Sequence, residues 1–159
     1  MTHSALTTHA APGSEAGPRV RLADLLALVG RVPLSIHQLL FRLAIAGVFL
    51  RAGLTKIMSW ESTVALFADE YKVPVLAPHV AAAMGATFEV GCSTLLLLGL
   101  GTRLAALPLI GMLTTIQLFV YPQAWPEHLV WGSILVFLVT RGGGAISLDH
   151  LIARVLRVK

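Results

Sequence analysis

Residues 79–107 read HVAAAMGATFEVGCSTLLLLGLGTRLAAL. The stretch opens with an apolar run at positions 80–100, which is long enough to cross the hydrocarbon core of a bilayer as a helix. Glu89 is the only charged residue in that run and lies close to its midpoint. A turn at 99–102 then leads to Arg103 and a second apolar run. The stretch therefore predicts a helical hairpin in a membrane, with a carboxylate at mid-depth.

The composition of the whole chain is that of a membrane protein. Its 159 residues are 56% hydrophobic and only 13% charged, whereas a soluble domain carries about 25% charged residues. The net charge of +4 comes from basic residues dispersed outside the apolar runs, which argues against nucleic-acid binding. Cys92 is the only cysteine, and the six histidines show no metal-binding spacing. We therefore expect no metal site and no covalently attached cofactor.

Hydrophobic periodicity predicts an all-α protein: an integral membrane four-helix bundle with short interfacial amphipathic helices at both ends. The bundle belongs to a membrane domain at 19–159. A tail at 1–18, rich in Ala, Thr, Ser, Gly and Pro, is expected to be disordered. The four spans are expected at about 36–58, 79–100, 104–121 and 128–144.

The two terminal helices are predicted from apolar residues that share one helical face. The first, at 21–29, either lies in the membrane interface or packs on the end of the bundle. The second begins near Ser147 and combines an apolar face with Arg154, Arg157 and Lys159. That combination is typical of a helix lying on an anionic membrane surface.

The distribution of basic residues predicts the orientation of the spans. With four spans, both termini and the loop between the second and third spans lie on the same side of the membrane. The two loops of the other side hold Lys72 as their only cation. Because loops and tails rich in Lys and Arg stay on the cytoplasmic side of a membrane, both termini are expected in the cytoplasm. The basic residues on the inner side are Arg19, Arg21, Arg31, Arg42, Arg103, Arg141, Arg154, Arg157 and Lys159.

Glu89 needs a partner, because a charge at mid-membrane costs about 2.5–3.5 kcal/mol on insertion scales. The rise along two antiparallel spans brings Arg51 close to its level, and an Arg can bind a carboxylate with two parallel hydrogen bonds. We therefore predict an Arg51–Glu89 pair, with Lys56 as the alternative partner. Gln117 on the third span is expected to satisfy the remaining donors. These four residues form the predicted intramembrane polar cluster.

Two interpretations of this cluster stay open. The pair either fixes the register of the helices, or it lines a small polar cavity for a quinone headgroup, an anion or a proton path. Small residues four apart, Ala81 and Gly85, precede Glu89 and direct that face towards another helix. Arg42 and Lys56 lie near opposite ends of the first span, so both side chains can reach the headgroups.

Three pieces of the sequence together resemble the DoxX family of small bacterial membrane proteins. They are RLAIAGVFLRAGLTK at 42–56, Glu89 and Gly91 followed by LLLLGLGTRLAA ending at Ala106, and GGGAISLD at 142–149. The resemblance covers about Leu39 to Asp149 and implies a four-helix bundle in the bacterial cytoplasmic membrane. The family pattern points to Arg42, Lys56, Glu89 and Arg103.

The resemblance also implies a function. Related proteins are membrane subunits associated with thiosulfate:quinone oxidation, or parts of membrane complexes with soluble redox enzymes. We therefore expect a non-catalytic subunit of a quinone-linked redox complex, an accessory protein more than an enzyme, and we assign no catalytic residue. The expected partners are membrane lipid, quinone, a soluble oxidoreductase and further copies of this chain. The alternatives are a small-anion or proton carrier or channel component, and a membrane scaffold for a soluble partner.

Overall fold

The computed structural model describes residues 22–157, which contain helices and no strand. The predicted all-α class is confirmed, and the tail predicted to be disordered at 1–18 lies outside the described residues. In chain order the elements are α1 (Leu22–Val29), α2 (Leu34–Met58), α3 (Trp60–Leu66), the π-helical η1 (Phe67–Tyr71), α4 (Pro78–Leu98), α5 (Thr102–Thr115), the π-helical η2 (Ile116–Val120), the 3₁₀-helical η3 (Pro122–Ala124), α6 (Trp125–Arg141) and α7 (Leu148–Arg157).

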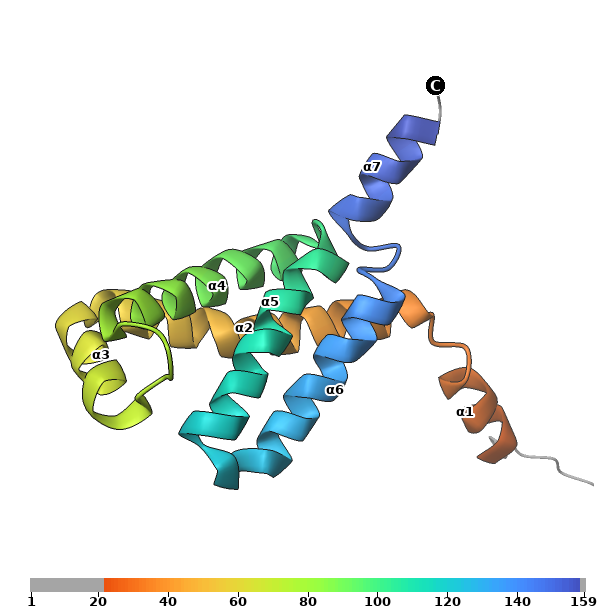
Figure 1. The fold of residues 1–159 in the computed structure, drawn as a ribbon. Helices are drawn as coiled ribbons and strands as arrows, with labels where there is room; N and C mark the ends of the chain where they lie inside the picture. Colours follow the sequence, from red (N-terminus) through yellow and green to blue (C-terminus); the bar gives the residue numbers. More distant parts are fainter. Residues whose placement is uncertain (1–21, 158–159) are drawn as a thin grey trace, which may run out of the picture. The chain divides into compact units, whose positions relative to one another are not determined.

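Four helices form the core of the unit at residues 33–159. Helix α4 runs back along α2, and α6 runs back beside α5 (Figure 1). Helix α2 also packs against α6, and α4 against α5, so each of the four contacts two others. The side chains between them are almost fully buried and mostly aliphatic: Ile45, Ala46, Phe49, Leu96, Ala106, Leu109, Leu135 and Leu138.

The outer surface of these helices is apolar as well. Large aliphatic side chains remain exposed on α2, α5 and α6, among them Leu40, Leu104 and Leu129. Two segments, Pro78–Leu98 and Thr102–Val120, are long and apolar enough to cross a membrane. Helix α2 is longer, with 25 residues, but carries three cations, and α6 has 17 residues. That α2 and α6 also cross the membrane stays a prediction, supported by their packing against the two apolar segments.

Helices α2 and α4 lie very close together at Gly53, a residue of the 42–56 stretch that resembles the family. A Cβ at this position would lie 2.7 Å from Cγ2 of Val90 and 2.8 Å from Cβ of Glu89. Gly85, expected to permit close packing of helices, instead faces Phe67, whose ring would lie 3.5 Å from an added Cβ. The residue that brings two helices together is therefore Gly53, and Gly85 contacts the π-helical segment η1.

From its place near one end of the first span, the Arg42 side chain was expected to be able to reach the lipid headgroups. In the structure it does not. Its side chain is only 2% exposed and donates hydrogen bonds to four carbonyl oxygens. Two of them, on Leu96 and Leu97, belong to the last turn of α4, where carbonyls lack partners within the helix. The other two, on Gly143 and Ile146, belong to the connection between α6 and α7. Arg42 thus joins the end of α4 to the end of α6.

The start of α7 is attached to the same end of the bundle. The carboxylate of Asp149 accepts hydrogen bonds from the backbone N–H groups of Gly101, at 2.7 Å, and Thr102, at 3.1 Å. These N–H groups open α5, so Asp149 caps that helix from a distant position in the chain. Gly99 has a φ of +69° and lies against the Arg42 guanidinium, where a side chain would collide.

Both terminal helices expose apolar side chains, and α7 is amphipathic. Helix α7 exposes Leu151, Ile152, Val155 and Leu156. Helix α1 belongs to a separate unit, residues 1–32, and exposes Leu26 and Val29. Exposed apolar faces of this kind fit the predicted contact with a membrane surface.

Candidate functional site

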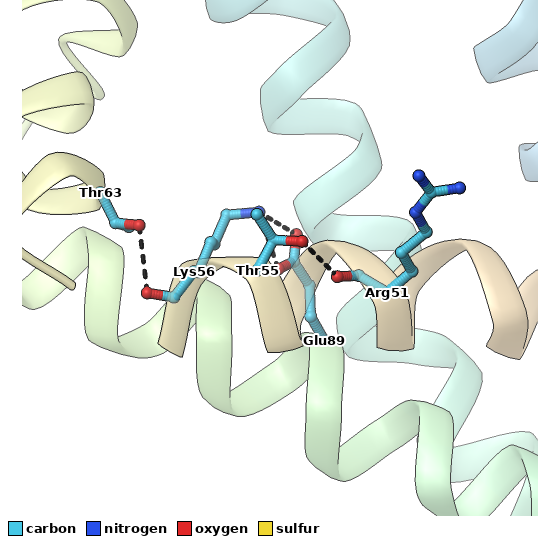
Figure 2. A network of polar contacts seen from close by, with 5 residues as sticks. All are labelled: Arg51, Thr55, Lys56, Thr63 and Glu89. Atoms are coloured by element: carbon cyan, nitrogen blue, oxygen red, sulfur yellow. Dashed lines mark hydrogen bonds and ion pairs between the residues drawn. The ribbon is translucent and has the colours of Figure 1, made fainter. Parts of the chain in front are cut away.

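Glu89 forms an ion pair with Lys56. The Lys56 Nζ lies 2.8 Å from both carboxylate oxygens (Figure 2), and the side chain of Glu89 is only 3% exposed. This is the alternative pairing of the sequence analysis, and the preferred Arg51–Glu89 pair is wrong. Figure 2 shows the Arg51 guanidinium extending away from the carboxylate. Among residues 22–157, Lys56–Glu89 is the one ion pair between side chains.

Helix periodicity explains why Lys56 is the partner. Gly53 faces Glu89, whose Cβ would lie 2.8 Å from a Cβ added at Gly53, and Lys56 follows three residues later, on the same face of α2. Arg51 precedes Gly53 by two residues, which turns its side chain by about 200° to the other side. The similarity in depth that favoured Arg51 was therefore a weaker criterion than the direction of the side chain.

A cavity of about 450 Å³ lies against this ion pair. It is enclosed by α4, α5, η1, η2 and the end of α2, and we call it the ion-pair pocket. Its polar groups are few: Lys56, Glu89, Thr115 and the tyrosines Tyr71 and Tyr121. The rest of its wall is apolar and includes Phe67, Val73, Leu76, Met84, Phe88, Pro108, Met112, Ile116 and Val120.

Both π-helical segments contribute to this pocket. Segment η1 supplies Phe67 and Tyr71, and η2 supplies Ile116 and Val120. Each segment ends with a hydrogen bond across five residues, from the N–H of Lys72 to the Phe67 carbonyl and from the N–H of Tyr121 to the Ile116 carbonyl. Single π-helical turns are rare and occur frequently at functional sites. Their occurrence on two walls of one cavity marks this pocket as the candidate site.

An aromatic cluster closes one side of the pocket. The rings of Tyr71 and Tyr121 pack edge to face with centroids 5.6 Å apart, and Phe67 packs against Tyr71 at 4.9 Å. The Tyr121 hydroxyl donates a 2.7 Å hydrogen bond to Glu70. Hydrogen bonding with Tyr71 and Glu70 favours the protonated phenol and raises the pKa of Tyr121 above its usual value. The sequence analysis assigned Tyr71 to no site, so its place in the pocket was missed.

Gln117 is not part of the site around Glu89, contrary to expectation. Its Oε1 lies 2.6 Å from Nδ1 of His128, and its Nε2 donates to the carbonyl of Pro122. His128 is buried and its ring lies against Trp131. This pair connects α6 to η2.

The residues of the family pattern divide into three places. Lys56 and Glu89 form the ion pair, and Arg42 holds the end of α4. Arg103 is exposed and lines a shallow depression at the α4–α5 turn, together with Gly142 to Gly144. Only two of the four residues therefore contribute to the candidate site.

The chemistry available at the site is binding and hydrogen bonding. Cys92 is a free, buried thiol outside the pocket lining. The part of the chain that the structure describes has no group of three or more His, Cys, Asp or Glu side chains suited to a metal ion. The ion pair, two tyrosines and apolar walls are suited to a largely apolar molecule with a polar headgroup.

Comparison with known proteins identifies the chain. The family model described as DoxX matches residues 37–122, a stretch that includes all the residues lining the ion-pair pocket, Lys56 and Glu89 among them. Neither the curated proteins nor the solved structures that were compared match the chain. Because the family model covers more than half of the sequence and the fold is that of a helical membrane protein, the chain belongs to the DoxX family.

Proposed function

We propose that this protein is a non-catalytic membrane subunit that binds a lipid-soluble quinone in the ion-pair pocket, within a quinone-linked redox complex. The observation that carries the proposal is an apolar cavity of about 450 Å³ with one buried ion pair in its wall. Pockets for small molecules measure about 300–1,000 Å³ and combine apolar walls with a few polar groups that fix orientation.

The donor set fits a quinone headgroup. The Lys56 ammonium has three N–H donors, and its bonds to the two Glu89 oxygens leave one for a further acceptor. The hydroxyl of Tyr71 also lines the pocket and adds a second polar group beside the Lys56 ammonium. Because Lys56 and Glu89 neutralise each other, the site suits an uncharged headgroup. A bound quinone supplies the redox chemistry, while these residues hold and orient it.

Two glycines provide a matched test of binding. Gly111 lines the pocket and Gly91 does not, yet a Cβ at either position meets no atom within 4 Å. We expect Gly111→Leu to fill the cavity and abolish quenching of tryptophan fluorescence by a short-chain ubiquinone analogue. Gly91→Leu, on an exposed face of α4, should bind as the wild type does. Both variants should keep the helical circular dichroism of the parent protein.

Equal quinone affinity in the two variants would refute the ion-pair pocket as the binding site. Absence of any saturable quenching in the wild-type protein would refute the quinone proposal itself. Copurification from native membranes then tests the complex. The proposal expects a soluble oxidoreductase, and recovery of this chain without a redox partner would count against the subunit role.

A proton or small-anion carrier is the second candidate. The observation that favours it is that Lys56 lines two pockets, the ion-pair pocket and a second one that Arg51 also lines. Reconstituted liposomes test this candidate directly, because a carrier must produce ion flux that is lost in a Lys56→Met, Glu89→Met double variant. An absence of flux for protons and common inorganic anions would remove it.

The proposed orientation places both termini in the cytoplasm of a bacterium, with the protein in its inner membrane. A reporter fused after Lys159 should be active only on the cytoplasmic side, and one inserted at Glu70 only on the outer side. Periplasmic activity of the Lys159 fusion would overturn the four-span orientation.

A further inference from the structure

A second pocket, of about 520 Å³, lies between α2 and α3 and is lined differently from the ion-pair pocket. We call it the α2–α3 pocket. From α2 it takes Val48, Arg51, Ala52 and Thr55, which recur at the spacing of one helical face. Helix α3 and the residue before it add Ser59, Ser62 and Leu66. A cation, hydroxyl groups and apolar side chains therefore meet in one hollow.

Arg51 is the residue that needs explanation. It lies on a helix predicted to cross the membrane, seven residues before the end of α2, which is about 10 Å along the helix axis. Its guanidinium points away from the Lys56–Glu89 pair (Figure 2), and among residues 22–157 no acidic side chain forms an ion pair with it. An Arg stays charged in proteins and is costly in a bilayer without an anionic partner.

The hydroxyl groups of the pocket fall into two kinds. Those of Thr55 and Thr63 donate to the backbone carbonyls of Arg51 and Lys56, at 3.0 and 3.1 Å. Those of Ser59 and Ser62 make no hydrogen bond in the described part of the chain and are exposed. Apart from the remaining N–H of Lys56, the donors open to a ligand are therefore the guanidinium of Arg51 and the hydroxyls of Ser59 and Ser62.

We propose that the α2–α3 pocket binds the phosphodiester of a membrane lipid. Arginine pairs with phosphate oxygens through two parallel hydrogen bonds, and serine hydroxyls add neutral donors to the same group. Lys56 is already neutralised by Glu89, so the pocket presents one uncompensated positive charge, which matches the single negative charge of a phosphodiester. Val48, Ala52 and Leu66 form apolar walls for the adjoining glycerol and acyl carbons.

A lipid fits better than a free anion for reasons of position. A residue about two turns from the end of a spanning helix reaches the phosphate level by extending its side chain along the helix. Exposed apolar side chains on the same helix, such as Leu54 and Ile57, would place acyl chains beside this pocket. A dissolved oxyanion would have to enter the same apolar surroundings without such chains.

Native mass spectrometry of the full chain tests the proposal, with phosphatidylglycerol titrated into delipidated protein. We expect Arg51→Gln to reduce retention of one lipid by about tenfold or more, because a charge-assisted bidentate contact is lost. Arg51→Lys keeps the charge but loses the two parallel hydrogen bonds, so it should retain less lipid than the wild type and more than Arg51→Gln. Arg103→Gln removes an exposed charge outside the α2–α3 pocket and should retain the lipid as the wild type does.

Two results would overturn the assignment. One is equal retention by the wild type and Arg51→Gln. The other is displacement of the lipid by inorganic phosphate at equal concentration, which would mean that the pocket takes dissolved anions. The ubiquinone assay, run on Arg51→Gln, separates this proposal from the proposed function, since Arg51 does not line the ion-pair pocket.

Discussion

Breaking the Lys56–Glu89 pair on one side should destabilise the protein far more than replacing both residues. The carboxylate is 3% exposed, and both of its oxygens lie 2.8 Å from the same ammonium. Removing one partner of such a buried pair typically costs about 3–5 kcal/mol, because the other charge is left uncompensated. Exchange of both for apolar side chains of similar length is often close to neutral.

The experiment is a double-mutant cycle with Lys56→Met, Glu89→Met and the double variant, followed by reversible unfolding in mixed micelles. We expect each single variant to lose about 3–5 kcal/mol and the double variant to recover most of it, so that the coupling exceeds about 2 kcal/mol. The matched control pairs Glu89→Met with Arg51→Met. Because Arg51 makes no contact with the carboxylate, this combination should be additive.

The same variants separate a structural role of the pair from a binding role. If the pair only joins α2 to α4, the stable double variant should bind the ubiquinone analogue with unchanged affinity. If Lys56 donates to the quinone, the double variant should be folded yet bind weakly. Additivity of Lys56→Met and Glu89→Met would refute the ion pair as described. If Arg51→Met and Glu89→Met were instead non-additive, the Arg51–Glu89 pair, first expected because the two residues lie at similar depth in the membrane, would be supported.

Four further predictions follow from contacts elsewhere in the fold. Gly53→Ala should cost about 1–3 kcal/mol through overpacking against α4. Gly47→Ala, with no atom within 4 Å of its added Cβ, should stabilise α2 by up to about 1 kcal/mol in the same unfolding assay. Arg42→Met should lose at least about 3 kcal/mol, because it leaves the carbonyls of Leu97, Gly143 and Ile146 without a donor, whereas Leu96 keeps its bond from the Gly99 N–H; native-like melting of this variant would contradict that assignment. Glu70→Gln should lower the raised pKa of Tyr121 towards 10, seen as earlier phenolate absorbance in a spectroscopic titration. Because that pKa is raised by folding, the associated stability is present at neutral pH and is lost as the pH rises through it, and an unchanged titration would exclude the Glu70 hydrogen bond.

The helices were predictable because their signals are local. A long apolar run interrupted by a Gly-Leu-Gly turn gives two antiparallel helices from composition and turn chemistry alone, and α4 and α5 follow that division closely. The π-helical ends at Phe67–Tyr71 and Ile116–Val120 carry no comparable signal. They depend on how the chain packs at the pocket, which sequence periodicity does not register.

The site shows where inference from the sequence reaches its limit. The sequence identified Glu89 as a buried charge and named both possible cations, since burial and charge follow from position within an apolar run. Choosing between Arg51 and Lys56 required knowing which face of α2 meets α4. That face was already marked, because Arg42, Phe49 and Lys56 recur every seven residues and Gly53 belongs to the same side. All four are buried or partly buried against the bundle, whereas Arg51 is exposed. A repeated spacing of residues along a membrane helix is thus better evidence for what it contacts than a match in depth between two charges, because depth leaves the direction of the side chain undetermined.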